Sequence, residues 1–144
     1  MNEVISLDLY FRDFVSKADR RLQFANDFNN TLLQNATNLL EQVNNLLNEL
    51  GIESADVTSG WRPVQINNKV TNAAKKSYHM SCLAVDILDN QNQDLAHLIA
   101  SRPDLLKKYN LWIENPQNTK GINTNWCHLD LGVRSDRPTR MFNP

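Results

Sequence analysis

The stretch SYHMSCLAVD, residues 77–86, places a histidine in a loop and, seven residues later, an aspartate inside the apolar run LAVDIL. This run alternates as a β-strand does, with Val85 on one face and Asp86 on the other. An ionised carboxylate among apolar residues is costly unless a partner compensates its charge. The sequence therefore predicts that Asp86 has a cationic partner, either a bound metal ion or a basic side chain such as Arg62 or Lys75.

Length and composition are those of one globular domain. The chain has 144 residues, 22% of them charged, with a net charge of -1, and shows no basic stripe for nucleic acid and no basic amphipathic helix for a membrane surface. Its first residues, MNEVISLDLYFRDF, lack the basic start and apolar core of a signal peptide, and no apolar run approaches the roughly 20 residues that span a bilayer. We expect a monomer with no nucleic-acid or membrane partner, made in the cytoplasm without a signal peptide. A role outside the cell would then require release by another route, such as lysis.

Helical patterns dominate the first third of the chain. Residues 31–50, TLLQNATNLLEQVNNLLNEL, place leucines at helical spacing, which predicts an amphipathic helix. Thr31 and Gln34 are expected to form a capping box at its start, and Gly51 is expected to end it. Residues 9–28 predict an earlier, weaker helical segment.

Strand patterns follow, interrupted by two short helices. The sequence predicts strands in DVTSGW (56–61), LAVDILD (83–89), LWIEN (111–115) and NWCHLDL (125–131), and helices in DLAHLIA (94–100) and PDLLKKY (103–109). Helices first and strands later predict an α+β fold, with N-terminal helices packed on a small antiparallel sheet. We expect a single domain made of a helical scaffold (1–51), a core that carries the chemistry (55–132) and a polar tail (133–144).

Three side chains in this region have the chemistry of a metal site. If the strands around Asp86 and His128 are neighbours, these two residues can converge with His79 from the preceding loop. Two imidazoles and one carboxylate are preferred zinc ligands, and a fourth position left to water is typical of catalytic zinc. The spacing alone also allows a site without metal, in which His79 is a capped loop residue and Asp86 pairs with a basic side chain.

A family resemblance favours the metal. SYHMSCLAVD resembles the SxHxxGxAxD signature of the zinc D-Ala-D-Ala carboxypeptidase family, whose relatives include phage endolysins and whose fold is shared with hedgehog signalling domains. VTSGWRP resembles the SGxR segment of that family, and NWCHLD resembles its closing WxH. The three motifs occur in order over residues 58–130, about half of the chain.

The resemblance implies roles for individual residues. It makes His79, Asp86 and His128 the zinc ligands, with Zn2+ as the cofactor. Arg62 and Ser77 match positions that help to hold the substrate or its developing charge in relatives. Trp126, on the strand face of His128, is expected to contact substrate, and Asp130 is expected to orient an imidazole, as carboxylates near zinc histidines often do.

The chain departs from the family pattern at two positions. Cys82 replaces the signature glycine, and we expect it and Cys127 to be free, buried thiols. Asn125 stands where many relatives have an acid three residues before the last histidine, and an amide cannot accept a proton. Glu114 is the candidate general base, because some phage relatives have a comparable Trp-x-Glu before the closing motif. The alternative is that Glu114 is a strand-end acid in a structural pair.

The predicted function is zinc-dependent hydrolysis of peptidoglycan stem peptides or cross-links, with Glu114 moving the proton and Arg62 binding the oxyanion or a terminal carboxylate. The sequence leaves open whether the enzyme is a carboxypeptidase or an endopeptidase. A compact domain without a signal peptide is typical of a phage or prophage lysis protein that acts on the cell wall after release. Because of Asn125, the alternative is a catalytically impaired, zinc-containing module that binds peptidoglycan.

Overall fold

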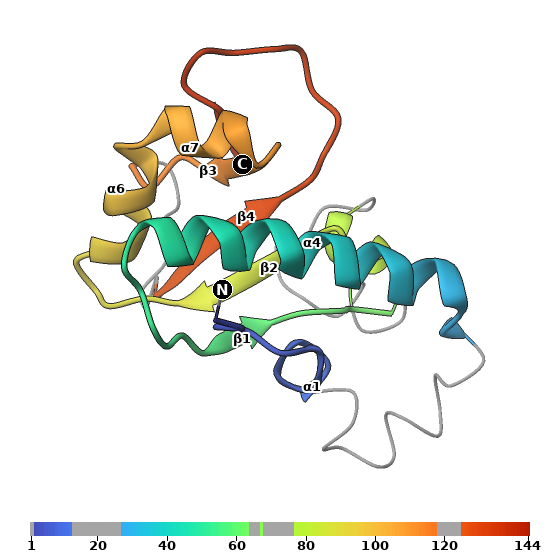
Figure 1. The fold of residues 1–144 in the computed structure, drawn as a ribbon. Helices are drawn as coiled ribbons and strands as arrows, with labels where there is room; N and C mark the ends of the chain where they lie inside the picture. The colour runs from blue at the N-terminus through green and yellow to red at the C-terminus, as the bar shows by residue number, and fades with distance from the viewer. Residues whose placement is uncertain (1, 13–26, 64–66, 68–76, 118–124) are drawn as a thin grey trace.

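The computed structural model describes residues 2–12, 27–63, 67, 77–117 and 125–144. These residues form an α+β fold in which a five-stranded sheet has the order β1-β2-β4-β3-β5 (Figure 1). The elements are α1 (Leu7–Tyr10), α4 (Asn30–Glu49), β1 (Val57–Ser59), the 3-10 helix η2 (Tyr78–Ser81), β2 (Ala84–Leu88), α6 (Asp94–Ala100), α7 (Pro103–Lys108), β3 (Trp112–Glu114), β4 (Trp126–Asp130) and β5 (Met141–Phe142).

The sheet is mixed, so the expectation of a purely antiparallel sheet is wrong at one edge. β1, β2, β4 and β3 pair antiparallel in that order, but β5 pairs parallel to β3. The main-chain N–H of Ile113 donates to Arg140 O and that of Asn115 donates to Phe142 O. Part of the segment expected to be a tail therefore covers the outer edge of the sheet. A strand of two residues is too short to produce an alternating pattern in the sequence.

Helix α4 confirms the predicted amphipathic helix, although it begins differently. In Figure 1 the helix lies across the sheet. Its apolar side belongs to the core, where Leu39, Val43 and Leu46 are fully buried. The predicted capping box is wrong, because the helix begins one residue earlier and the side chain of Asn29 accepts the N–H of Leu32 at 3.0 Å. Gly51 ends the helix as predicted, with a φ of 73° that suits glycine. No helix in the described residues is long and apolar enough to cross a bilayer.

The N-terminal segment lies along α4. The Asn44 side chain accepts the N–H of Ile5 and donates to its carbonyl, at 2.8 and 3.0 Å, as a paired strand would. The helix predicted over residues 9–28 is present only at its start, in α1, and residues 13–26 lie outside the described residues. Tyr10 ties this segment to β2 by donating its hydroxyl to Ala84 O at 2.8 Å.

The two faces of the sheet differ in chemistry. Val85, Ile87 and Leu129 are fully buried in the core that includes α4. Because side chains alternate along a strand, Asp86 and His128 lie on the opposite face, where they are direct cross-strand partners. The apolar face therefore anchors the sheet on α4 and leaves the other face for polar side chains.

Candidate metal centre

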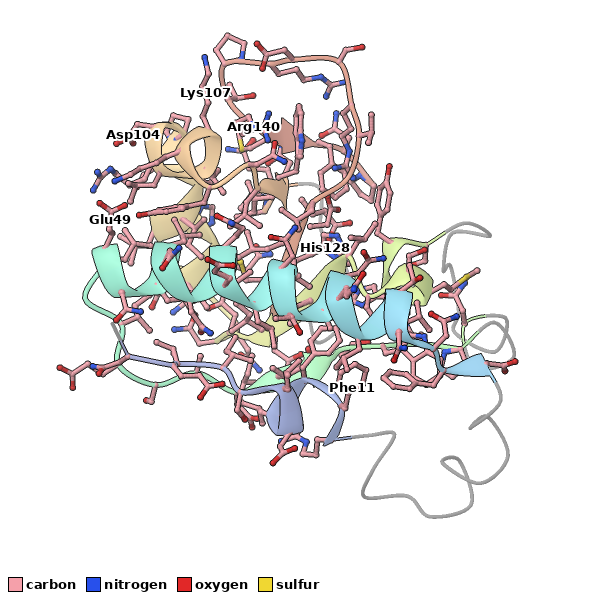
Figure 2. The ribbon with its side chains drawn as sticks, turned by 45° about the vertical axis from the view of Figure 1, so that its right-hand side comes forward. Phe11, Glu49, Asp104, Lys107, His128 and Arg140 are labelled. Atoms are coloured by element: carbon pink, nitrogen blue, oxygen red, sulfur yellow. The ribbon has the colours of Figure 1, made fainter. Side chains whose placement is uncertain are left out.

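The three predicted ligands converge in the structure. One ligand atom from each of His79, Asp86 and His128 can be chosen so that all three lie within 4.8 Å of one another. His128 Nδ1 is 2.8 Å from Asp86 Oδ1, and His79 Nε2 is 3.3 Å from Asp86 Oδ2. Strands β2 and β4 supply two members and η2 supplies the third; Figure 2 labels His128. We call these three residues the ligand cluster.

Local backbone structure orients His79. The Oγ of Ser77 caps η2 by accepting the N–H of His79 at 3.2 Å, and His79 Nδ1 lies 2.8 Å from Gly60 O. Because a carbonyl can only accept, Nδ1 carries the proton and Nε2 presents its lone pair to Asp86. Gly60 must be a glycine here, since an added Cβ would lie 2.0 Å from Tyr10 O.

His128 lies between two carboxylates. Its Nδ1 is 2.8 Å from Asp86 Oδ1 and its Nε2 is 2.7 Å from Asp130 Oδ2. Burial alone would lower the pKa of His128, but the hydrogen bonds to Asp130 and Asp86 outweigh it and raise that pKa to about 10. Burial would raise the pKa of Asp86, yet the neighbouring His79 and His128 lower it far below its ordinary value. Without a metal, the protonated His128 thus compensates the charge of Asp86.

These residues fit a divalent cation such as zinc. The buried Nε2 of His79 has no hydrogen-bond partner among the described residues, so its lone pair is left for an ion. The donor set of two imidazole nitrogens and one carboxylate is one that zinc prefers in open, catalytic sites. A cation would also compensate the charge of Asp86, which is the partner that the apolar strand requires.

Arg62 lies close to the cluster without pairing with it. Its main-chain N–H donates to His79 O at 3.1 Å. Its side chain is partly buried, and its buried Nε has no hydrogen-bond partner in the part of the chain that the structure describes. Burial lowers the pKa of Arg62 and the Asp86 charge raises it, so the net shift is downward. Asp86 itself pairs with the two histidines; Lys75, the other basic partner considered, lies outside the described residues.

Glu114 and Trp126 lie on the polar face of the sheet. The register pairs Trp112 with Asp130 and Ile113 with Leu129, so the next residue of β3, Glu114, lies across from His128. Its carboxylate is partly buried and is not a member of the ligand cluster. Trp126 is two residues before His128 on the same face, is partly exposed, and is the cross-strand partner of Leu88.

The Asp130 carboxylate is fully buried behind His128. It accepts hydrogen bonds from Arg134 Nη1 and Nη2, at 2.6 and 3.0 Å, and from Gly132 N at 2.9 Å. Burial would raise the pKa of Asp130, but the hydrogen bonds from His128 and Arg134 lower it. Asp130 is thus in hydrogen-bond contact with His128, and its orienting role stays a prediction.

Sequence reasoning missed two side chains next to the cluster. The ring of Phe142 lies 5.5 Å from that of His128, and the guanidinium of Arg134 lies 3.7 Å from the Phe142 ring. Both residues belong to the segment expected to be a tail. The four-residue spacing of Asp130 and Arg134 is visible in the sequence, but outside a helix such spacing predicts no contact.

The cysteines are as predicted. Both Cys82 and Cys127 are free and buried. Neither belongs to the ligand cluster, which consists of two histidines and one aspartate.

Comparison with known proteins identifies one related family. A family model described as Peptidase M15 matches residues 19–130. The matched range is most of the chain and includes the whole ligand cluster together with Asp130. No curated protein and no solved structure matches the chain.

Proposed function

The chain belongs to the peptidase M15 family of zinc-dependent metallopeptidases, and we propose that it hydrolyses amide bonds in peptidoglycan stem peptides or cross-links. The observation that carries this proposal is the ligand cluster, with its His-Asp-His donor set and an unpartnered imidazole nitrogen. His79, Asp86 and His128 would hold the zinc ion. Bound there, zinc supplies a Lewis acid that polarises the scissile carbonyl and makes the attacking water more acidic.

Glu114 is the proposed general base. It lies on the polar face of the sheet, and the register places it across from His128. Glu114 would accept the proton of the attacking water and deliver it to the leaving amine. General acid–base catalysis of this kind contributes typically about 10²–10⁴-fold to the rate.

Arg62 is the proposed anchor for the substrate. A guanidinium matches a carboxylate or an oxyanion with two parallel N–H groups, and the buried Nε of Arg62 has no protein acceptor among the described residues. If Arg62 binds the terminal carboxylate, the enzyme is a carboxypeptidase; if it binds the oxyanion of an internal bond, an endopeptidase is favoured. Ser77 and Trp126 would contact the peptide on either side of the cluster.

The proposed biological setting follows from the resemblance to phage endolysins. The enzyme would act as a phage or prophage lysis protein, reach the cell wall after release, and work there as a monomer. Peptidoglycan peptide would be its partner, with no role for nucleic acid or membrane.

The test replaces Glu114 by glutamine and measures product release from purified peptidoglycan and from a stem pentapeptide ending in D-Ala-D-Ala. Glu114→Gln keeps the shape of the side chain and removes its basicity. We expect the rate to fall by about two to four orders of magnitude while zinc content and folding stay at wild-type values. Glu41→Gln, a change at an exposed acid on α4, is the matched control and should retain full activity.

The products separate the alternatives. Free D-alanine indicates a carboxypeptidase, and muropeptide fragments indicate an endopeptidase. If the wild type binds zinc but cleaves nothing in a broad peptidoglycan panel, the protein is instead the binding module. The amide of Asn125, which cannot accept a proton, is the feature that favours this alternative. Equal activity of the wild type and Glu114→Gln would make Glu114 a structural residue.

A further inference from the structure

We propose that Arg134 is a positioning residue for the metal centre, which acts through Asp130 to fix the proton of His128 on Nε2 and to leave Nδ1 for the metal. This inference rests on the proposed function, because it assumes that His128 is a ligand. It concerns a residue outside the three sequence motifs, in a segment that the sequence suggested was a tail.

The hydrogen bonds around Asp130 carry the argument. Oδ1 accepts from Arg134 Nη1 at 2.6 Å and from Gly132 N at 2.9 Å, and Oδ2 accepts from Arg134 Nη2 at 3.0 Å. His128 Nε2 makes the remaining contact, at 2.7 Å from Oδ2. An ionised carboxylate is only an acceptor, so in the metal-free protein both nitrogens of His128 carry protons, Nε2 towards Asp130 and Nδ1 towards Asp86. A cation held by Asp86 would take the place of the Nδ1 proton, and the hydrogen bond to Asp130 would keep the other proton on Nε2.

An aromatic cage holds the Arg134 guanidinium in place. It lies 3.7 Å from the Phe142 ring centroid, 5.3 Å from that of Tyr78 and 5.4 Å from that of Trp112. Stacking on aromatic faces suits the planar guanidinium and fixes its direction. The side chain is only 18% exposed, so its hydrogen bonds to Asp130 are well shielded from water.

The cage also links the backbones that carry the two histidines. Tyr78 directly precedes His79, and its hydroxyl accepts the N–H of Val133 at 3.2 Å. At Gly132, an added Cβ would lie 2.5 Å from the Tyr78 ring and 2.7 Å from Arg134 Nη1. The absence of a side chain at this position is what allows the loop after β4 to bring Arg134 back over Asp130.

Without Arg134 the position of Asp130 would be poorly determined. The buried carboxylate would lose the two hydrogen bonds from Arg134, which are the bidentate pair that fixes its plane. The imidazole of His128 could then rotate and present the protonated nitrogen to the cluster. Outer partners of this kind typically alter metal affinity by about 10–100-fold when they are replaced.

The first experiment measures zinc affinity by competition with a chromogenic chelator. Arg134→Gln should bind zinc about 10–100-fold more weakly than the wild type. Arg134→Lys keeps the charge but lacks the planar fork, so its loss should be smaller. Arg102→Gln is the matched control, because Arg102 also donates two hydrogen bonds to an aspartate, Asp104, at 3.1 and 3.0 Å, but this exposed pair lies at the start of α7 and makes no contact with Asp130. It should keep wild-type zinc affinity.

A double-mutant cycle tests whether Arg134 acts through Asp130. The double variant Asp130→Asn with Arg134→Gln should bind zinc no more weakly than Asp130→Asn alone. Once the Asp130 carboxylate is gone, Arg134 has no route to His128, so its removal should have no further effect. Fully additive losses would overturn the inference. ¹⁵N NMR of the imidazole in the zinc-loaded wild type should find the proton of His128 on Nε2; a proton on Nδ1 would also overturn it.

The outcomes separate this inference from the proposed function. If the wild type binds zinc and Arg134→Gln binds it equally tightly with the same proton position, only the role of Arg134 is wrong. If the wild type binds no zinc, both proposals are wrong. If Arg134→Gln fails to fold, zinc affinity and the proton position of His128 are measured in Arg134→Lys instead, and wild-type values for both would overturn the role of Arg134.

Discussion

The backbone conformation of Cys82 explains one departure from the family pattern. It ends η2 in the left-handed region, with a φ of 57°, where a side chain costs energy and glycine does not. The glycine in the resembled signature therefore matches a conformational requirement of this turn. Cys82 adopts the same conformation, and its thiol is fully buried against the core. The departure changes the packing and leaves the path of the loop to His79 intact.

The thiol of Cys82 should make stability depend on alkaline pH. Burial raises the pKa of Cys82 to about 12, from an ordinary value near 9. Ionisation of this thiol is therefore easier in the unfolded chain than in the folded protein. Its effect on the free energy of unfolding is absent below about pH 9, and that free energy falls as pH rises from 9 towards 12. We expect Cys82→Gly, which has no thiol, to lose less stability than the wild type over that range in urea unfolding.

The same variant tests the ligand assignment at this position. Cys82→Gly should retain full zinc content, because the ligand cluster does not include the thiol. Loss of zinc would make Cys82 a ligand and contradict the three-residue site.

Removal of any member of the ligand cluster should remove most of the metal. His79→Ala, Asp86→Ala and His128→Ala each leave two donors for an ion that needs at least three from the protein. Metal analysis of purified protein should give close to one zinc per chain for the wild type and little for each variant. Full zinc content in the variant that lacks both histidines would sink the assignment. His97→Ala is the control, since His97 is exposed on α6.

At the scale of elements, α4 supports the site through its polar side chains as well as its apolar ones. Asn35 Nδ2 donates to Ser81 O at 3.0 Å, which ties α4 to η2, the turn that carries His79. Asn44 and Asn48 bond the backbone of the N-terminal segment. These asparagines of α4 therefore supply hydrogen-bond partners to backbone groups outside the helix.

The start of α4 gives a prediction with a built-in control. Asn29→Ala removes the side chain that accepts the N–H of Leu32, and loss of such a cap costs typically about 1 kcal/mol in the free energy of unfolding. Thr31→Ala, at the position expected from the sequence to cap the helix, should be nearly neutral because Thr31 is exposed and lies inside the helix. Urea unfolding measures both. The reverse order of effects would restore the capping box.

At the scale of the whole molecule, the C-terminal strand joins the fold to the site. β5 covers the edge of β3 and brings the Phe142 ring against His128 and Arg134. Arg140 anchors this strand by donating to Leu111 O and stacking on Trp112. Phe142 thus lies next to the ligand cluster although no motif marks it.

Truncation tests this contribution. A chain that ends at residue 140 lacks β5 and the Phe142 ring, so we expect a loss of about 1–3 kcal/mol in the free energy of unfolding, as for removal of a packed aromatic side chain, together with weaker zinc binding. A chain that ends at residue 142 keeps both and should match the wild type. Thermal unfolding and chelator competition give the two readouts. Wild-type zinc affinity in the shorter chain would show that β5 is only an edge cover.

The sequence by itself determined the elements with strong periodicity and the residues with unusual chemistry. The leucine spacing of α4, the alternation of β2 and β4, and an aspartate in an apolar strand are local properties, and local properties can be read without the fold. His79, Asp86 and His128 could be selected as candidates because few residue types bind zinc and an ionised residue in an apolar strand requires a partner, and the family resemblance then favoured a metal over a basic side chain.

Only the tertiary structure decided which groups surround that site. Gly60 supplies a carbonyl, Arg134 a bidentate pair and Phe142 a ring, and no local pattern predicts any of these three contacts. The pairing of β5 with β3 is likewise invisible in a two-residue strand. These contacts join segments far apart in the sequence. They can stabilise the protein only after the loops between those segments have closed, so a short stretch of sequence does not predict them. The members of the ligand cluster were therefore predictable, whereas the surroundings that orient them were a product of the fold.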